Sequence, residues 1–440
     1  MVGTISWITT TALFAQASAF QLVVPEGAKI FTYIDTAMES GNLVPAIIFV
    51  ACSSEATLRA YNTRMTYAVA IGSCFTAVLL GTLWDTQIGG ASVVILAGAW
   101  SSGAVGSTSM LVLFNFAGRY GRDAVSALSV GIGSCGLVTN ILGIVQGLPK
   151  LKDSGGSSSH HSNQSSVTPL TPSSSGATLD GKLLFGPSVF FIAVGVWIIF
   201  GCCFLRMLDT FSQWKIATAT APTDHADSST AETGIQSSLT SAGGNSVNSE
   251  MSASSLPVAY VETTKRFSLL EKLNEAMNSI VSAVHQNSGS MAAIFVSCFL
   301  EFAAPGLIPY QVPKGVNHAA NSFWVTVFYL SGSLLGRLLT AVVSFQKFTL
   351  LNILQGLTLV YMLVVARMED VTIPVPISIA VVAVGSAIHG YIVTEVFQTC
   401  REVGNSARTS AVAGLANQLG ALSGSLFVFM LVKLSIIGGK

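Results

Sequence analysis

The stretch FTYIDTAMESGNLVPAIIFVA, from Phe31 to Ala51, combines an apolar second half with two carboxylates, Asp35 and Glu39. A run of about 20 mainly apolar residues is long enough to cross a bilayer as a helix. Asp35 and Glu39 lie four residues apart and Asn42 follows three residues later, so the three share one helical face. Lipid offers a polar face no hydrogen-bonding partners, so the face must point into the protein. The stretch therefore predicts a membrane helix beside an internal site. The alternative is that Asp35 simply reaches water at the helix end.

The composition favours an integral membrane protein. Of 440 residues, 51% are hydrophobic and only 10% are charged, and the mean hydropathy is +0.63. One soluble core does not readily bury so much apolar surface. Lysine plus arginine equals aspartate plus glutamate at 21 each, so no charge excess indicates a nucleic-acid partner. The seven cysteines lie in or beside apolar runs, which argues against a disulfide framework or a zinc site. We expect neither a metal nor a cofactor.

Eleven apolar runs have the length of a spanning helix. The first lacks a basic start and a clear cleavage site, so we interpret it as a membrane helix and not as a removed signal. The expected fold is all-α, with about eleven transmembrane helices. The runs are 5–24, 30–53, 66–84, 91–115, 124–148, 184–207, 290–312, 321–345, 348–367, 373–399 and 408–436.

A central polar segment divides these runs into six and five. It is rich in serine and threonine and too monotonous to pack, as is a shorter segment from Asp153 to Thr178. Two bundles joined by a long central loop are typical of transporters. We predict an N-terminal half at 1–207, a disordered cytoplasmic loop at 208–285 and a C-terminal half at 286–440.

The charges in the loops predict an orientation. Lysine and arginine are more frequent in the loops that face the cytoplasm if the N-terminus is cytoplasmic and the C-terminus extracellular. The sequon Asn163-Gln164-Ser165 then falls outside the cell, as glycosylation requires.

The seventh run carries a carboxylate ahead of two helix breakers. Glu301 lies midway along it, and Pro305 and Pro309 follow. Interrupted helices near the bilayer midplane are where many transporters bind their solutes. The alternative is a kink that serves packing alone. Tyr310 and Gln311 add an aromatic face and an amide at the same place.

The last helices add further polar groups. His389 is either a structural hydrogen-bonding group or part of a proton relay, and Tyr391 and Glu395 share another face of the same run. Arg337 in the eighth run either extends to the interface or enters the bundle. The amides Asn417 and Gln418 either bind a ligand or hold helices together.

Small residues surround that amide pair. Gly414, Gly420 and Gly424 include a G-x-x-x-G spacing, which predicts a close helix contact. The sequence contains no H-E-x-x-H, G-x-x-x-x-G-K-[ST] or G-x-S-x-G motif, so we do not expect an enzyme or an ATP-driven pump.

Taken in order, these motifs resemble the eukaryotic riboflavin transporter family, solute carrier family 52. The resemblance extends over all eleven runs. It rests on Ser6-Trp7, Pro25-Glu26-Gly27, Tyr33, Gly41-Asn42-Leu43, Leu83-Trp84, Gly131-x-Gly133, Val145-Gln146-Gly147, Gly306-x-x-Pro309, Gly332-Ser333, Tyr391, Ala413-Gly414, Gln418, Gly420 and Gly424.

The resemblance implies a multi-pass plasma-membrane importer of riboflavin that works by alternating access, either facilitative or influenced by protons. The chain departs from the family pattern at its acids. Gln16 stands where the family has a carboxylate, whereas Asp35 and Glu39 replace small or apolar residues and Glu301 falls near a family asparagine. Our hypothesis is that the acidic function has moved from the first helix to the second and seventh.

Riboflavin combines a flat apolar ring with a polar edge and a hydroxylated chain, so aromatic and amide or carboxylate groups suit it. Another flat solute such as a nucleoside, and a polytopic receptor or scaffold, stay as alternative functions, and the oligomeric state is open. The expected substrate-binding residues are Gln16, Tyr33, Glu39, Asn42, Phe116, Tyr310, Gln311, Tyr391, Asn417 and Gln418, and the proton-coupling candidates are Asp35, Glu39, Glu301, His389 and Glu395.

Overall fold

The described part of the chain is helical. The computed structural model describes residues 1–51, 55–118, 122–151, 183–220, 287–315, 317–368, 373–404 and 407–438, with isolated positions between 274 and 285. The described residues contain no β-strand, and an isolated bridge joins Ile88 and Ala91. The predicted all-α class is therefore confirmed.

Two groups of helices follow one another along the chain. The N-terminal group comprises α1 (Thr4–Val23), α2 (Ile30–Ser40), α3 (Leu43–Ala51), α4 (Glu55–Leu83), α5 (Val93–Gly118), α6 (Arg122–Gln146) and α7 (Pro187–Thr220). The C-terminal group comprises α9 (Ser288–Phe302), α10 (His318–Leu339), α11 (Phe348–Arg367), α12 (Val375–Gly404) and α13 (Ala407–Lys433). Short 3-10 helices are η1 (Gly27–Lys29), η2 (Leu148–Lys150) and η3 (Pro305–Gln311).

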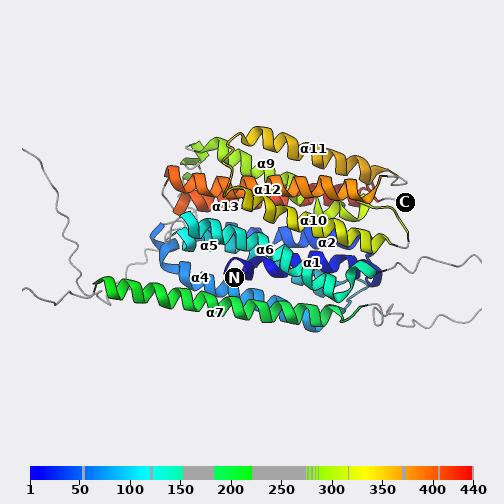
Figure 1. The fold of residues 1–440 in the computed structure, drawn as a ribbon, viewed down its shortest axis with the longest axis horizontal. Helices are drawn as coiled ribbons and strands as arrows, with labels where there is room; N and C mark the ends of the chain where they lie inside the picture. Colours follow the sequence, from blue (N-terminus) through cyan, green and yellow to red (C-terminus); the bar gives the residue numbers. More distant parts are fainter. Residues whose placement is uncertain are drawn as a thin grey trace, which may run out of the picture.

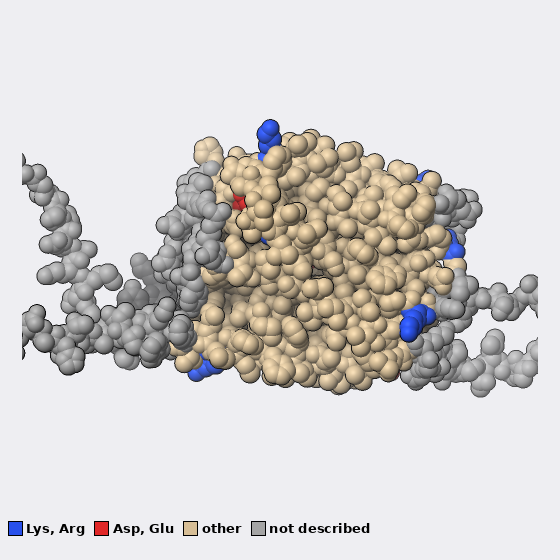
Figure 2. Space-filling view, viewed as in Figure 1, with Lys and Arg blue, Asp and Glu red and all other residues tan. Residues whose placement is uncertain are grey.

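The helices have the dimensions of membrane spans. Nine stretches in the described residues are long and apolar enough to cross a bilayer. The two remaining predicted runs correspond to α1 and to α2 followed by α3. In Figure 2, lysine and arginine lie toward the ends of the molecule, and the broad middle of this face is uncharged. This distribution suits a bundle whose middle faces lipid.

The two groups form two halves that pack face to face. Figure 1 shows α1 to α7 on one side of the molecule and α9 to α13 on the other, with the helix axes along its length. Within the halves, α4 packs between α5 and α7, α10 packs on α12, and α9 packs on α13. Between them, α6 contacts α10, and α2 contacts α13 and η3. The expected two-bundle arrangement is confirmed.

The second predicted span is broken in the middle. α2 ends at Ser40 and α3 begins at Leu43, so Gly41 and Asn42 form the junction. Pro45 has no backbone N–H and its ring clashes with the carbonyl four residues earlier, which belongs to Gly41. The junction also lies tightly on α5, because a Cβ on Gly41 would come within 2.4 Å of the backbone nitrogen of Ala104.

The seventh predicted span is interrupted as expected. α9 ends at Phe302, and the chain continues as η3, which contains Pro305 and Pro309. The predicted close contact in the last helix is also present. A Cβ on Gly420 or Gly424 would come within 2.3 or 2.1 Å of a carbonyl oxygen of α9.

The sixth span is longer than predicted. α7 continues to Thr220, so the segment expected to be a loop from residue 208 begins as helix. No glycine or proline interrupts residues 208–220. Asp209 joins α7 to α4, because it accepts a hydrogen bond from the Tyr67 hydroxyl at 3.3 Å, and it also pairs with Arg206 of α7 itself at 3.7 Å. Residues 221–273 and the sequon at Asn163 lie outside the described residues.

We predict that Gly336→Ala destabilises the protein. A Cβ on Gly336 would come within 1.8 Å of the Ala387 carbonyl oxygen, so α10 and α12 must separate. Overpacking of this kind costs about 1–3 kcal/mol. The thermal midpoint of the purified protein in detergent should fall. The matched control is Gly356→Ala in α11, where the nearest atom is 3.9 Å away. Equal midpoints for both variants would contradict the close packing.

Candidate functional site

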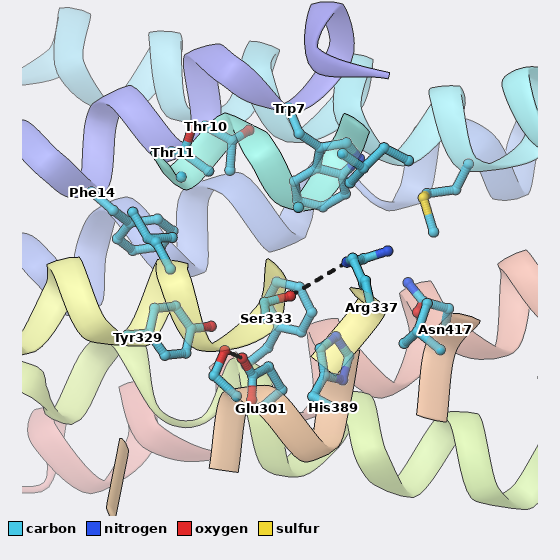
Figure 3. Close-up of a pocket in the computed structure, with 18 residues that line it drawn as sticks. Trp7, Thr10, Thr11, Phe14, Glu301, Tyr329, Ser333, Arg337, His389 and Asn417 are labelled. Atoms are coloured by element: carbon cyan, nitrogen blue, oxygen red, sulfur yellow. Dashed lines mark hydrogen bonds between the residues drawn. The ribbon is translucent and has the colours of Figure 1, made fainter. Parts of the chain in front are cut away.

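A cavity of about 90 Å³ lies between the two halves (Figure 3). It is large enough for several water molecules. Three helices each present one stripe of side chains to it, at spacings of three, four or seven residues that place them on one face. The lining residues are Trp7, Thr10, Thr11 and Phe14 of α1, Met110 of α5, Ile132, Gly133 and Gly136 of α6, Glu301 and Phe302 of α9, Tyr329, Leu330, Ser333 and Arg337 of α10, Ser386, His389 and Val393 of α12, and Asn417 of α13.

Arg337 gives the cavity a positive charge. Its side chain is only 6% exposed. Nη1 donates to the Ser129 hydroxyl of α6 at 2.8 Å, and Nε donates to the Ser333 hydroxyl at 3.5 Å. Among the described residues, no carboxylate lies within ion-pairing distance of Arg337. A buried guanidinium that contacts only hydroxyls favours a bound group rich in hydrogen-bond acceptors.

Glu301 lies on the opposite wall and is held by two donors. The Ser386 hydroxyl donates to Oε1 at 2.7 Å, and the Gln355 amide donates to Oε2 at 3.4 Å. Figure 3 shows Tyr329 beside this carboxylate. Fixed hydrogen bonds hold the carboxyl group in one orientation at the cavity wall, so it is available to a hydroxylated solute.

His389 has a defined tautomer. Its Nδ1 lies 3.1 Å from the Ser297 hydroxyl, which itself donates to Oε1 of Gln355 at 2.8 Å. The single Ser297 hydroxyl proton is therefore used, and Ser297 can only accept from His389. Nδ1 then carries the ring proton, and Nε2 of the neutral ring is an acceptor. The edge of the ring also packs against Phe302, with centroids 5.9 Å apart.

α1 contributes polar atoms that lack partners. The indole nitrogen of Trp7 and the hydroxyl of Thr10 are buried and make no hydrogen bond with any described residue. Both residues face Glu301 and Arg337 across the cavity in Figure 3. Buried donors are nearly always satisfied in native proteins, so these two point to groups supplied by water or a solute.

Three of the residues predicted from sequence line this cavity: Glu301, His389 and Asn417. Asn417 accepts a hydrogen bond from the Cys298 thiol at 2.8 Å, which fixes the amide beside His389. Their role in transport stays a prediction.

Several other predicted residues lie away from it. Gln16 pairs with Gln146, its amide donating at 2.5 Å, and so joins α1 to α6. Phe116 belongs to the apolar core. Tyr33 packs on Phe429 with centroids 6.1 Å apart. None of the three predicted residues lines the cavity.

Four more predicted residues make structural contacts within the C-terminal half. The Gln311 amide donates to the Met362 carbonyl oxygen at 2.9 Å, and Tyr310 packs against the core with its hydroxyl unpaired. Tyr391 donates to the Val343 carbonyl oxygen at 3.0 Å, and Glu395 accepts from Ser344 at 3.1 Å. The last two hold the connection between α10 and α11 on α12.

The remaining predicted residues form a separate cluster where α2 meets α13. Asp35, Glu39, Asn42 and Gln418 are all buried, which confirms that the polar face of the second span points inward. They do not line the cavity. The described residues contain no group of three or more histidine, cysteine or acidic side chains arranged to hold a metal ion.

Sequence reasoning missed most of the cavity. The sequence does not single out Trp7, Thr10, Tyr329 or Ser386, and it leaves open whether Arg337 reaches the interface or enters the bundle. The family resemblance could have indicated Trp7, because Ser6-Trp7 is one of the motifs on which it rests. The positions of the others depend on how α1, α10 and α12 are rotated against each other.

Known proteins with a similar fold are transporters. The xylose transporter XylE from E. coli, in a partially occluded inward-open conformation, matches with a TM-score of 0.52 and 13% identity over 100% of this chain and 91% of its own. A bacterial homologue of the human lysosomal transporter Spinster matches with a TM-score of 0.45 and 12% identity over 99% and 82%. The first likeness shows the fold alone. No curated protein matches the chain.

A family model gives the identity. The model of the solute carrier family 52 riboflavin transporters matches residues 1–437, nearly the whole chain. This membrane transporter therefore belongs to solute carrier family 52, the riboflavin transporters.

Proposed function

We propose that the protein moves riboflavin across the plasma membrane through the cavity between its halves. One observation carries this proposal: the cavity combines aromatic rings with buried, unpaired donors and an arginine that has no carboxylate partner. The substrate itself comes from the family. The family and the fold point to a transporter and not to an enzyme.

The chemistry of the lining suits a flavin. The cavity of about 90 Å³ is too small for a flavin in this state, so the two halves would separate before the flat ring packs among Trp7, Phe302 and Tyr329. The carbonyl oxygens and ring nitrogens at its polar edge accept hydrogen bonds, which Arg337 donates in a forked geometry. The hydroxylated chain would then reach Thr10 and Glu301 on the remaining walls.

Contacts toward each end of α6 join the two halves on either side of the cavity. Toward its first residues, Ser129 is hydrogen-bonded to Thr394 at 2.8 Å as well as to Arg337. Toward its last residues, the Asn140 amide donates to the Val327 carbonyl oxygen at 3.0 Å. Rocking of the two halves would break one set while the other forms, which is alternating access. Arg337 lines the cavity and also donates to Ser129, so it takes part in the first of these contacts.

A nucleoside is also flat and rich in acceptors, so it is the second candidate solute. A receptor or scaffold would not move either compound. Competition and uptake therefore separate the three functions in one assay.

The test is saturable uptake of labelled riboflavin by cells that express the chain. Arg337→Lys keeps the charge but loses the forked donor, so uptake affinity should fall about tenfold or more. The matched control is Arg367→Lys, because Arg367 is exposed and its only hydrogen bond with a described residue is to the Ile436 carbonyl oxygen. Its uptake should equal that of the wild type.

Two results would contradict the proposal. Wild-type protein that reaches the cell surface and moves no riboflavin would remove the substrate assignment. Uptake blocked equally by a nucleoside would shift it to the second candidate.

We further propose a cytoplasmic N-terminus and an extracellular C-terminus, supported by the loop charges. In Figure 1, α7 begins at the end of the bundle where the chain finishes. The start of α7 and the C-terminus therefore belong to the same side of the membrane, which this orientation makes the outside. The orientation places Asn163 outside.

Endoglycosidase treatment should therefore increase the gel mobility of the wild-type protein, because it removes a glycan from Asn163. The Asn163→Gln variant should show no such shift. The matched control is Asn245→Gln in the central segment, which contains no sequon. A wild-type protein without glycan in a glycosylating cell would speak against this orientation.

A further inference from the structure

The pair formed by Asp35 and Glu39 is buried outside the solute cavity. Their side chains are 0% and 1% exposed. They lie one helical turn apart on α2, and α13 covers them from the other half of the molecule. Two carboxylates this close in a protein interior repel each other if both are ionised.

The hydrogen bonds leave this pair poorly compensated. Glu39 accepts a hydrogen bond from the Asn42 amide, which also donates to the Gln418 carbonyl oxygen at 3.3 Å. Neither oxygen of Asp35 has a partner among the described residues. The nearby Ser425 hydroxyl is bonded to Thr36 at 3.4 Å. The side-chain amide of Gln418 is also buried without a partner.

Among the described residues, no cation balances the pair. α1 and α5, which pack on α2, contain no ionisable side chain, and α13 carries Arg408 and Lys433 only near its ends. The titratable groups that face the pair from other helices are Cys298 of α9 and Tyr329 of α10, and Tyr310 of η3 faces Tyr33 on α2. Glu301 of α9 interacts with Cys298 and Tyr329. None is a base that could hold a positive charge.

Arg337 is the only buried lysine or arginine among the described side chains. The described residues therefore bury five carboxylates, those of Asp35, Glu39, Asp209, Glu301 and Glu395, against one arginine, and neither Asp35 nor Glu39 pairs with that arginine. An isolated ionised carboxylate at membrane depth is costly and normally takes up a proton or a cation. The excess of acids over bases requires such a ligand.

We propose that Asp35 and Glu39 bind one proton between them and couple its movement to that of riboflavin, an inference that rests on the proposed function. Water on one side supplies the proton, an O–H bond forms on one carboxylate, and the same bond breaks when the site opens to the other side. The site lies on the seam between the halves, because Asn42 contacts Gln418 and Thr36 contacts Ser425. Rocking of the halves therefore opens and closes it together with the cavity.

The surroundings favour a proton over a sodium ion. A metal cation needs several converging oxygen ligands. Here the nearest amide, that of Asn42, presents its nitrogen to Glu39, and the Gln418 carbonyl oxygen already accepts from that amide. A proton needs only one carboxylate oxygen, and the second carboxylate nearby favours its uptake.

The experiment uses the full chain purified and reconstituted in liposomes, with labelled riboflavin outside. Counterflow at equal pH, with unlabelled riboflavin inside, measures exchange alone. Accumulation with an acidic exterior measures coupling, and a one-unit pH difference should drive at most about tenfold accumulation for one proton per solute. A sodium gradient at equal pH is the third arm.

Asp35→Asn keeps the side-chain volume and removes the titratable group. Because Asp35 accepts no hydrogen bond, the variant should fold, which size-exclusion chromatography checks. It should lose the pH-driven accumulation and still exchange solute, and Glu39→Gln should do the same. The matched control is Glu26→Gln at the end of the bundle, where the carboxylate accepts from Ser92. It should accumulate riboflavin like the wild type.

Several results would overturn the inference. They are wild-type counterflow without pH-driven accumulation, accumulation driven by sodium instead, or undiminished accumulation in a folded Asp35→Asn. The wild-type measurements with a pH gradient and with a sodium gradient test the inference even if both variants fail to fold. Absence of wild-type counterflow would instead overturn the proposed function, and the coupling with it.

Discussion

Charged groups buried in the bilayer must be balanced inside the protein, and this constraint governs the centre of the molecule. Arg337 is buried with hydroxyl partners and Glu301 lies on the opposite wall of the same cavity, while Asp35 and Glu39 are buried in a separate cluster where α2 meets α13. Water could solvate such groups in a soluble protein, but lipid cannot. The two halves therefore meet over these groups and cover them. The same burial makes each group respond strongly to a solute or a proton, because the surrounding dielectric constant is low.

The broken helices follow from the same constraint. α2 ends at Ser40 and α9 at Phe302, each close to a buried acid. A break frees backbone groups that only a protein interior can satisfy. The structure shows this at Thr32, whose hydroxyl donates to the Gly306 carbonyl oxygen at 3.1 Å. The contact also crosses between the halves, so the irregular backbone lies at the interface that has to move.

The sequence predicted the fold better than the site. Apolar runs fix where helices lie, and Pro305 and Pro309 fixed one interruption, because both effects are local. The cavity is different, since it depends on how separate helices rotate against each other. Gln16 faces Gln146 and not the solute, although its residue type suited a flavin. Arg337 near a helix end resembles a residue that reaches the interface, and only the packing of α6 on α10 turns it inward. The polar face of α2 was predictable because i, i+4 spacing is local.

The most direct measurement is riboflavin binding to the purified chain, followed by quenching of flavin fluorescence. Trp7 lines the cavity, whereas Trp324 packs on Phe323 away from it. The account predicts saturable quenching by wild type and by Trp324→Leu, and greatly reduced quenching by Trp7→Leu. Saturable quenching that survives in Trp7→Leu, or its absence in the folded wild type, would contradict a flavin site between the halves.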